Sequence, residues 1–303
     1  MTTNAQIQRH DTVISNIIDA AGISAMEVTK IIENRVAEII LATSTPNDSL
    51  PEITLAVNEP WRAWANGVSE SLDAAAQDTI RLYSELGAPE TPTPADIEQV
   101  NRLKDAAESS LAAPAGETIS NIYAAIVYAA ALGLSSADTA ARARISVSGY
   151  LATVTDPSVT RLQEQYRRLI RTRNYEGARV ALAAVRDAWG ATPVGPNLLA
   201  MSRTASHDAV MDFDSVYGQW RGESLGVDRW RYAGGVSATT RDFCSSVSGR
   251  EFTREQAREL WSTRSWGGKR SGDPFVVRGG YNCRHYWVPV SDAIVGNLRQ
   301  LQV

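Results

Sequence analysis

Hydrophobic residues in the first part of the chain recur with the spacing of amphipathic helices. The first pattern follows the i, i+3, i+4, i+7 spacing of one helix face and consists of Val13, Ile14, Ile17, Ile18 and Ala21. We expect this helix to end at Gly22 and a second helix to begin at Ser24, because Ser24 and Glu27 have the spacing of a capping box. Residues 43–51, TSTPNDSLP, end the second helical pattern.

Further helical patterns fill the chain as far as residue 190. One covers 61–86 and stops at Gly87, a proline-rich connector follows over 88–94, and a helix resumes over 95–111 with two more after it. No run before residue 200 shows the period-two alternation that is typical of a strand. The sequence therefore predicts an all-α region over 1–190 that packs against partners.

The longest apolar run is Ile122–Leu134, IYAAIVYAAALGL. It is too short to span a bilayer, because a transmembrane helix needs about 20 apolar residues. We expect it to form a buried helix, since alanine lets neighbouring helices approach closely. An alternative is that this helix is exposed and enters a bilayer during a delivery event.

The sequence changes character after residues 191–197, ATPVGPN, where it becomes aromatic and rich in glycine. A helix is predicted over Leu198–Trp220, a strand over 227–232, and a short helix over 253–261. These elements predict a small α+β C-terminal module at 198–292, with a tail at 293–303. The expected fold is mainly α: a helical N-terminal region followed by this C-terminal module.

The net charge of −4 is the sum of two unlike halves. Residues 1–150 carry 9 Lys and Arg against 19 Asp and Glu, whereas residues 151–303 carry 21 against 15. A composition with 44% hydrophobic and 21% charged residues is typical of a globular protein and not of a disordered or multi-span membrane chain. Two cysteines and a start without a signal-peptide pattern predict the reducing cytoplasm, or a particle assembled there.

An arginine-rich helix is predicted over 160–189. Its positive face includes Arg161, Arg167, Arg168, Arg171 and Arg173, with Arg179 and Arg186 further on. Such a face can follow a phosphate backbone or bind an acidic protein surface. It can equally be a solvated helix with internal ion pairs, such as Glu164 with Arg167 or Arg168.

A second basic segment is the glycine-rich loop at 265–280. Lys269, Arg270 and Arg278 lie there beside Trp266 and five glycines. Backbone amides, cationic side chains and a stacking ring could contact nucleic acid. The alternative is a turn-rich connection between short strands.

Cys244, Cys283 and His285 form the one set with the chemistry of a site. With His207 or Asp242 they could bind zinc, which accepts sulfur and imidazole nitrogen in a tetrahedron. They could also form a Cys244–Cys283 disulfide or remain two packed thiols. A catalytic dyad of Cys283 and His285 is disfavoured, because residues two apart on a strand are spaced about 6–7 Å.

Four ordered motifs in the C-terminal module resemble a known family. They are Arg203-Thr204 on the first helix, Thr240-Arg241 with Cys244, the turn Gly249–Phe252, and Asn282-Cys283-Arg284. Over residues 198–290 this order is similar to the C-terminal module of the MuF-like minor head, or head morphogenesis, proteins of phages. Members usually have His-Pro before the Asn and a second Cys after the Arg, whereas this chain has Gly280-Tyr281 and His285. That departure weakens any inference about a metal or a disulfide.

The resemblance implies a structural protein of a tailed phage, present inside the head or at its portal vertex and assembled in the host cytoplasm. Its implied partners are the portal, the major capsid protein or internal proteins, in multiple copies, with packaged double-stranded DNA as a further partner. We expect no enzymatic activity, no catalytic residue, no cofactor, no resident metal and no membrane contact. The alternatives are an ejected internal protein that acts on the host membrane, and an enzyme or toxin that uses Cys283.

Overall fold

The computed structural model describes residues 4–43, 49–148, 164–165, 168–169, 177, 180–181, 197–236, 240–281 and 283–290. The chain divides into two compact units. Unit 1 comprises Met1–Ala25, Arg62–Ala113 and Ser202–Val303, and unit 2 comprises Met26–Trp61 and Pro114–Met201. Most of the described residues are helical and every described strand lies after residue 228, which confirms the predicted mainly α fold with a small α+β C-terminal part.

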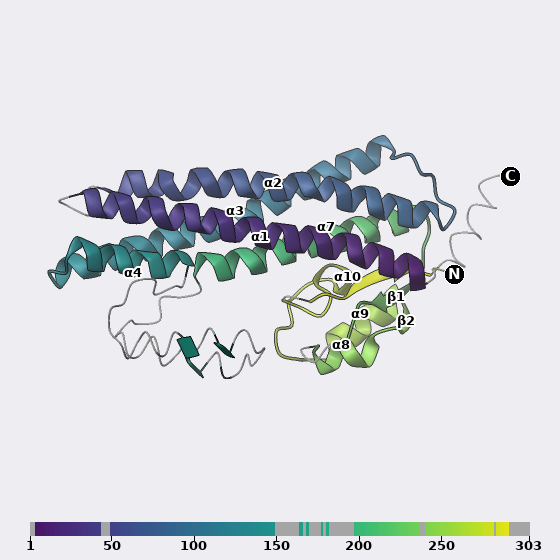
Figure 1. The fold of residues 1–303 in the computed structure, drawn as a ribbon. Helices are drawn as coiled ribbons and strands as arrows, with labels where there is room; N and C mark the ends of the chain where they lie inside the picture. Colours follow the sequence, from purple (N-terminus) through teal and green to yellow (C-terminus); the bar gives the residue numbers. More distant parts are fainter. Residues whose placement is uncertain are drawn as a thin grey trace. The chain divides into compact units, whose positions relative to one another are not determined.

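Within the described ranges, helices precede the first strand and supply segments to both units (Figure 1). They are α1 (Asn4–Ala42), α2 (Leu50–Ser84), α3 (Pro94–Ala131), α4 (Ser136–Ser148) and α7 (Leu198–Ser224). Helix α3 begins with a capping box in which Thr93 and Asp96 exchange hydrogen bonds. The helices are longer than the hydrophobic patterns predict.

Helix α1 is continuous where the sequence predicts a break at Gly22. The Ser24 hydroxyl donates to the carbonyls of Ala20 and Ala21, as a residue inside a helix does, and therefore caps no new helix. The buried face continues through Ala21 and Ala25, and an interior glycine costs only about 1 kcal/mol relative to alanine. The prediction of two helices here was wrong because it gave this glycine too much weight.

Two prolines likewise lie inside helices that the sequence predicts to be shorter. Helix α2 begins at Leu50 and contains Pro60, and helix α3 contains Pro114. A proline removes one helical hydrogen bond, but burial on both sides holds the helix together. Val57 and Trp61 are buried on either side of Pro60.

The helices of unit 1 enclose a buried polar network within an aliphatic core. His10 on α1 contacts Asp78 on α2 at 2.7 Å and Asp214 on α7 at 3.1 Å. Two turns further along α7, Arg221 pairs with Asp96 at the start of α3. Both networks are buried and connect different helices, so they fix how these segments of unit 1 pack.

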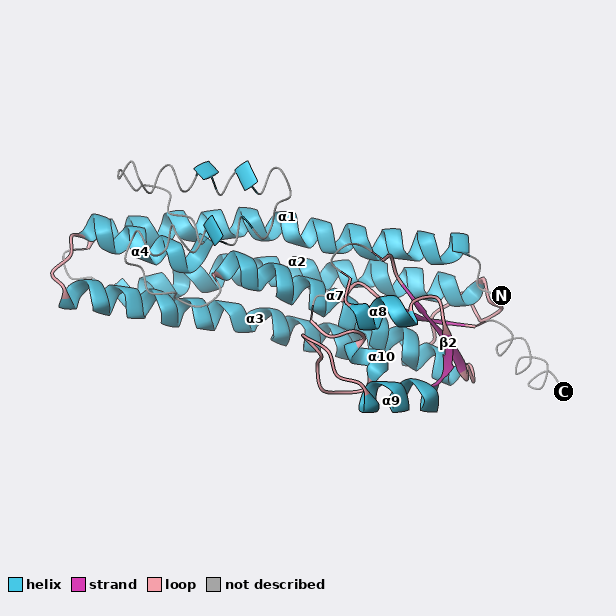
Figure 2. Ribbon diagram, turned by 90° about the horizontal axis from the view of Figure 1, so that it is seen from below, coloured by secondary structure: helices cyan, strands magenta, loops and turns pink. Residues whose placement is uncertain are grey.

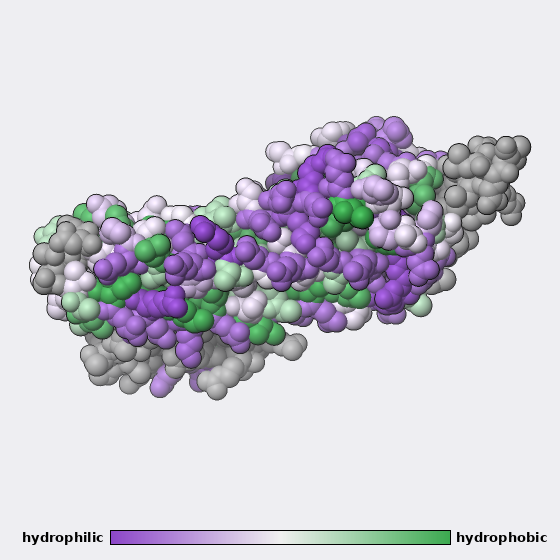
Figure 3. Space-filling view, turned by 90° about the horizontal axis from the view of Figure 1, so that it is seen from above, coloured by the Kyte–Doolittle hydropathy of each residue, from purple (hydrophilic) through white to green (hydrophobic). Residues whose placement is uncertain are grey.

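Unit 2 contains the C-terminal parts of α1 and α3, the N-terminal part of α2, and α4. These segments pack around aliphatic residues. The apolar run predicted to be a buried helix is buried on one face only: Ile122, Ile126 and Ala129 are buried, whereas Tyr123, Val127, Tyr128 and Leu132 are exposed. On the face of the molecule in Figure 3, hydrophobic residues form small patches separated by hydrophilic ones. Among the described residues, no helix has both the length and the hydrophobicity to cross a membrane.

The strands belong to a compact part of unit 1, residues 229–290, which we call the sheet region. It contains β1 (Arg229–Ala233), α8 (Asp242–Val247), β2 (Glu251–Thr253), α9 (Arg254–Thr263), α10 (Pro274–Val277) and β3 (Tyr286–Pro289). The strands, magenta in Figure 2, form an antiparallel sheet whose order is β2-β1-β3. Alternation along the central strand places Trp230 and Tyr232 on the same side, where they meet Phe275, Trp261 and Trp287.

Direct contacts join the sheet region to the helices of unit 1. Gly222 on α7 leaves room for the Trp230 ring, because a Cβ atom at this position would lie 2.3 Å from it. The Tyr286 hydroxyl on β3 donates to the carbonyl of Ile7 on α1 at 3.1 Å. Arg270 makes two hydrogen bonds to Asp212 of α7 at 2.9 and 3.0 Å. The sheet region is therefore an integral part of unit 1.

Candidate functional site

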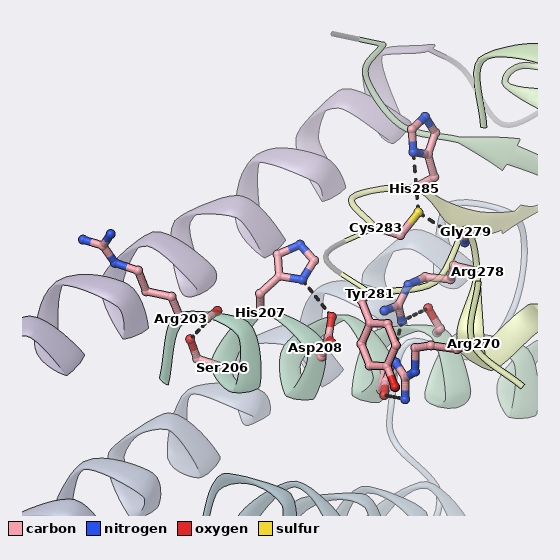
Figure 4. Close-up of polar contacts among 12 residues, drawn as sticks. Arg203, Ser206, His207, Asp208, Arg270, Arg278, Gly279, Tyr281, Cys283 and His285 are labelled. Atoms are coloured by element: carbon pink, nitrogen blue, oxygen red, sulfur yellow. Dashed lines mark hydrogen bonds and ion pairs between the residues drawn. The ribbon is translucent and has the colours of Figure 1, made fainter. Parts of the chain in front are cut away.

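A cluster of two thiols and an imidazole lies in the core of the sheet region. The sulfur atoms of Cys244, on α8, and Cys283, just before β3, are 3.9 Å apart. The Nδ1 atom of His285 points toward the Cys283 sulfur (Figure 4) and lies 3.7 Å from it. The donor atoms of all three residues lie within 4.8 Å of one another. The structure therefore brings together the three residues that the sequence singles out as a possible metal or disulfide set.

Two features of the local sequence hold the cluster closed. The Arg241 guanidinium, one turn before Cys244, donates to the carbonyls of Gly267 and Tyr281 and so ties two loops to the start of α8. Gly279 makes room for the sulfurs, since a Cβ atom there would lie 2.3 Å from the Cys244 sulfur and 2.7 Å from the Cys283 sulfur. No other residue type fits at position 279 without moving the thiols.

Hydrogen-bond donors surround the Cys283 sulfur. The backbone N–H of Gly279 donates to it at 3.2 Å, and the Tyr232 hydroxyl oxygen lies 3.5 Å from it and 3.6 Å from the Cys244 sulfur. The hydrogen bond with Cys244 lowers the pKa of Cys283 most, and His285 and Tyr232 lower it further against the opposing effect of burial. The same bond, together with burial, raises the pKa of Cys244. Cys283 is therefore the sulfur that carries negative charge most readily.

The cluster is closed to solvent. Cys244, Cys283 and His285 are 1%, 2% and 3% exposed, and Tyr232 is fully buried. The spacing of about 6–7 Å expected for Cys283 and His285 was wrong, because residues 283–285 precede β3 and their side chains converge to 3.7 Å. Proton transfer between the two side chains is thus feasible, but no substrate can reach them without opening the core.

The proposed fourth zinc ligands do not join the cluster. His207 lies on α7, where its Nδ1 atom faces Asp208 at 3.1 Å (Figure 4). Asp242 is exposed at the start of α8. Among the described residues, the group of metal-binding donor atoms consists of Cys244, Cys283 and His285 alone.

The residues that carry the family resemblance fall into two places. Arg241, Cys244 and Cys283 meet around the cluster, and the N–H of Gly249, in the turn after α8, donates to the Tyr232 carbonyl at 2.7 Å. The others are not in the cluster: Arg203 and Thr204 on α7, half-buried Thr240, and exposed Arg284. Asn282 lies outside the described residues.

The basic residues of the glycine-rich loop have partners inside unit 1. The Lys269 ammonium donates to the carbonyls of Trp261 and Arg264 at the end of α9, and Arg270 pairs with Asp212. Arg278 is fully buried and also pairs with Asp212. These contacts support the alternative in which this loop is a structural connection.

The arginine-rich segment lies largely beyond what the structure describes. Arg161, Arg167, Arg171, Arg173, Arg179 and Arg186 are outside the described residues, and Arg168 is an exposed helical residue. Asp212, the carboxylate that pairs with both Arg270 and Arg278, was not singled out from the sequence. No local signal marks it, because its partners lie about sixty residues further along the chain.

Sequence reasoning also missed Tyr232 and Gly279. The alternation in VDRWRY, residues 227–232, predicts that Trp230 and Tyr232 share a face, but nothing in it shows that this face meets two thiols. Comparison with known proteins finds no matching family model, no matching curated protein and no matching solved structure. The geometry and the motifs of this chain are therefore the basis for any assignment of function.

Proposed function

We propose that this chain is a structural minor head protein of a tailed bacteriophage, which acts in head assembly by binding other virion proteins. One observation carries the proposal: motif residues that are distant in the sequence act as a structural framework. Arg241 ties together loops 26 and 40 residues away, next to the contact between Cys244 and Cys283. A fold held by these positions explains why the resemblance is confined to them.

The burial of the thiols favours a binding role over catalysis. A nucleophile must reach a substrate. Cys283 is buried in the core of the sheet region, where solvent reaches almost none of its surface. The distance of 3.7 Å between the Cys283 sulfur and His285 Nδ1, with the lowering of the pKa of Cys283 by its hydrogen bonds, favours the alternative, a cysteine enzyme. Replacing Cys283 by Ser separates the two: the binding role predicts loss of folding or assembly, and an enzyme predicts a well-assembled but inactive chain.

The charge distribution supports protein partners for the first half of the chain. Residues 1–150 carry ten more acidic than basic residues, so they repel DNA and suit a basic surface on a protein partner. DNA contact belongs to the basic second half in this proposal. Full-length protein should then shift duplex DNA at low ionic strength, with an affinity that falls steeply as salt is added. No shift at low salt would remove DNA from the list of partners.

The decisive experiment locates the chain in particles. We expect it in purified intact heads, at low copy number near the portal vertex, by mass spectrometry and electron cryomicroscopy. Arg241→Ala should reduce incorporation because two loops lose their tie to α8, whereas Arg229→Ala, which removes an exposed ion pair with Glu251, should leave incorporation unchanged. Absence from intact heads would overturn the proposal.

The membrane alternative has its own test. The exposed side chains of Tyr123, Val127 and Leu132 are the surface that it would use. Flotation of the full-length protein with anionic liposomes should show no association in the proposed assembly role. Stable flotation that Val127→Glu abolishes would instead favour an ejected protein that acts on membranes.

A further inference from the structure

We propose that Cys244, Cys283 and His285 bind a zinc ion in the core of the sheet region. This inference goes beyond the assembly role and does not depend on it. It rests on the positions of the donor atoms, on the surroundings of the two sulfurs, and on their burial.

Two of the three donor spacings are already close to those of a tetrahedral metal site. Zinc–sulfur and zinc–nitrogen bonds of about 2.3 and 2.0 Å place two sulfurs about 3.8 Å apart, and a sulfur and a nitrogen about 3.5 Å apart. The observed distances are 3.9 Å between the sulfurs and 3.7 Å between the Cys283 sulfur and His285 Nδ1. With all three atoms within 4.8 Å of one another, small side-chain rotations complete one face of the tetrahedron.

The Tyr232 hydroxyl oxygen provides the fourth position. A zinc–oxygen bond of about 2.0 Å puts the oxygen about 3.5 Å from each sulfur of a tetrahedron. The oxygen of Tyr232 lies 3.5 and 3.6 Å from the two sulfurs. Two sulfurs, one nitrogen and one oxygen are thus the four donors of the proposed site. Gly279 keeps a Cβ atom away from three of them, because that atom would lie 2.3 Å, 2.7 Å and 3.2 Å from the Cys244 sulfur, the Cys283 sulfur and the Tyr232 oxygen.

Burial makes a cation the natural partner of these sulfurs. A thiolate sealed in an aromatic core is costly unless an opposite charge or several hydrogen bonds compensate it. The Gly279 N–H bond to Cys283 is the kind of outer contact that orients a metal-bound thiolate. A divalent ion that replaces the thiol protons leaves the two-sulfur site neutral.

A disulfide explains less of the same geometry. Its sulfurs would have to approach to about 2.05 Å, which is nearly 2 Å closer than they are. It would also leave His285, which faces Cys283, without a role. Zinc uses both sulfurs and the imidazole, so it accounts for the whole cluster.

The test measures zinc in the full-length chain, purified without chelators from cells supplied with zinc. Elemental analysis should find about one zinc per chain, as a single four-ligand site requires. Cys244→Ser, Cys283→Ser and His285→Ala should each lose most of it. His207→Ala is the matched control, because His207 is a buried histidine outside the cluster and its loss should leave zinc in place.

A second pair of variants tests the cluster without removing a ligand. Gly279→Ala places a methyl group against both sulfurs and should abolish zinc binding, whereas Gly267→Ala, in the same loop with open space around it, should retain it. If Gly279→Ala binds zinc as the wild type does, the ion is not at this cluster.

A measurement on the unmodified chain guards against variants that fail to fold. Both thiols should resist a thiol reagent in the native protein and become reactive when a strong zinc chelator removes the ion. Cobalt(II) added to the metal-free chain should give thiolate-to-cobalt charge-transfer bands. Absence of zinc and of these bands would overturn the proposal, as would a non-reduced chain with no free thiols and a mass lower by two hydrogens.

Discussion

The helices of unit 1 and the sheet region differ in the groups that their most characteristic polar contacts join. Between the helices, side chains bond to side chains: His10 to Asp78 and Asp214, and Arg221 to Asp96. In the sheet region, the indole nitrogens of three tryptophans donate to backbone carbonyls: Trp261 to Arg278, Trp266 to Gly279 and Trp287 to Pro274.

The difference follows from the backbone. A helix satisfies most of its own N–H and C=O groups, so the charged side chains between helices pair mainly with one another. The sheet region has short elements and long turns, which leave carbonyls that only a side chain or water can satisfy. Tryptophan suits this role because it buries a large ring and offers one donor. Stability therefore depends on charge pairs in one region and on aromatic donors in the other.

The largest effect is expected from breaking the charge pair between α7 and α3. Arg221→Ala leaves Asp96 buried without its cation and should cost about 3–5 kcal/mol of unfolding free energy. Denaturant unfolding of the full chain measures it. Arg102→Ala, which removes an exposed pair with Glu98, is the control and should cost at most about 0.5 kcal/mol. Equal losses of unfolding free energy in the two variants would show that burial does not make the Arg221–Asp96 pair more important than an exposed pair.

The His10 network makes the helices of unit 1 sensitive to alkali. Burial alone would lower the pKa of His10, but Asp214 and Asp78 outweigh it and raise the pKa from 6.5 to about 10. The stabilisation that charged His10 gives to the folded state is therefore complete below pH 6.5 and is lost as the pH rises through about 10. The free energy of unfolding should fall by a few kcal/mol at most over this range. Unfolding free energies of wild type and His10→Gln should converge across this range. Parallel curves would contradict a charged His10.

The contact between the two regions is tested at a pair of glycines on α7. Gly222→Ala forces a methyl group against the Trp230 ring and should cost about 1–3 kcal/mol. Gly218→Ala, four residues earlier, meets open space and should be neutral or slightly stabilising, since alanine favours helix. Thermal unfolding of both variants gives the comparison. A harmless Gly222→Ala would mean that Trp230 does not pack on α7 as described.

The smallest effect concerns a single donor in the sheet region. Trp266→Phe keeps a ring stacked on Phe243 but leaves the Gly279 carbonyl without its indole donor. We expect a loss of about 1 kcal/mol, measured by denaturant unfolding. A loss above that of Arg221→Ala would reverse the contrast between the two regions.

The sequence predicts the class of the fold but not the ends of its helices. Periodic hydrophobicity identifies the helical region, because each long helix repeats the same spacing of apolar residues many times. The change to aromatic and glycine-rich sequence identifies the small α+β part. Gly22, Pro60 and Pro114 lie inside helices because buried faces on both sides outweigh local preferences. The stabilisation of a helix by burial depends on the residues that pack against it, and a local sequence pattern does not show which residues those are.

The candidate site was predictable as residue types and not as geometry. The chemistry of cysteine and histidine singles out Cys244, Cys283 and His285 whatever the fold of the chain. Their convergence depends on the pairing of β1 with β3 and on Arg241, whose acceptors lie 26 and 40 residues away. Gly279 and Tyr232 complete the cluster through contacts that have no local signature.

The hydrogen bond between the Tyr286 hydroxyl and the Ile7 carbonyl can form only late in the synthesis of the chain. Its two residues are 279 positions apart, so the first helix leaves the ribosome long before its partner exists. At about 5–20 residues per second, the interval is roughly 15–60 s. During that time the residues of α1 that later contact β3 lack their partner. The packing between α1 and the sheet region therefore forms only after most of the chain has been translated.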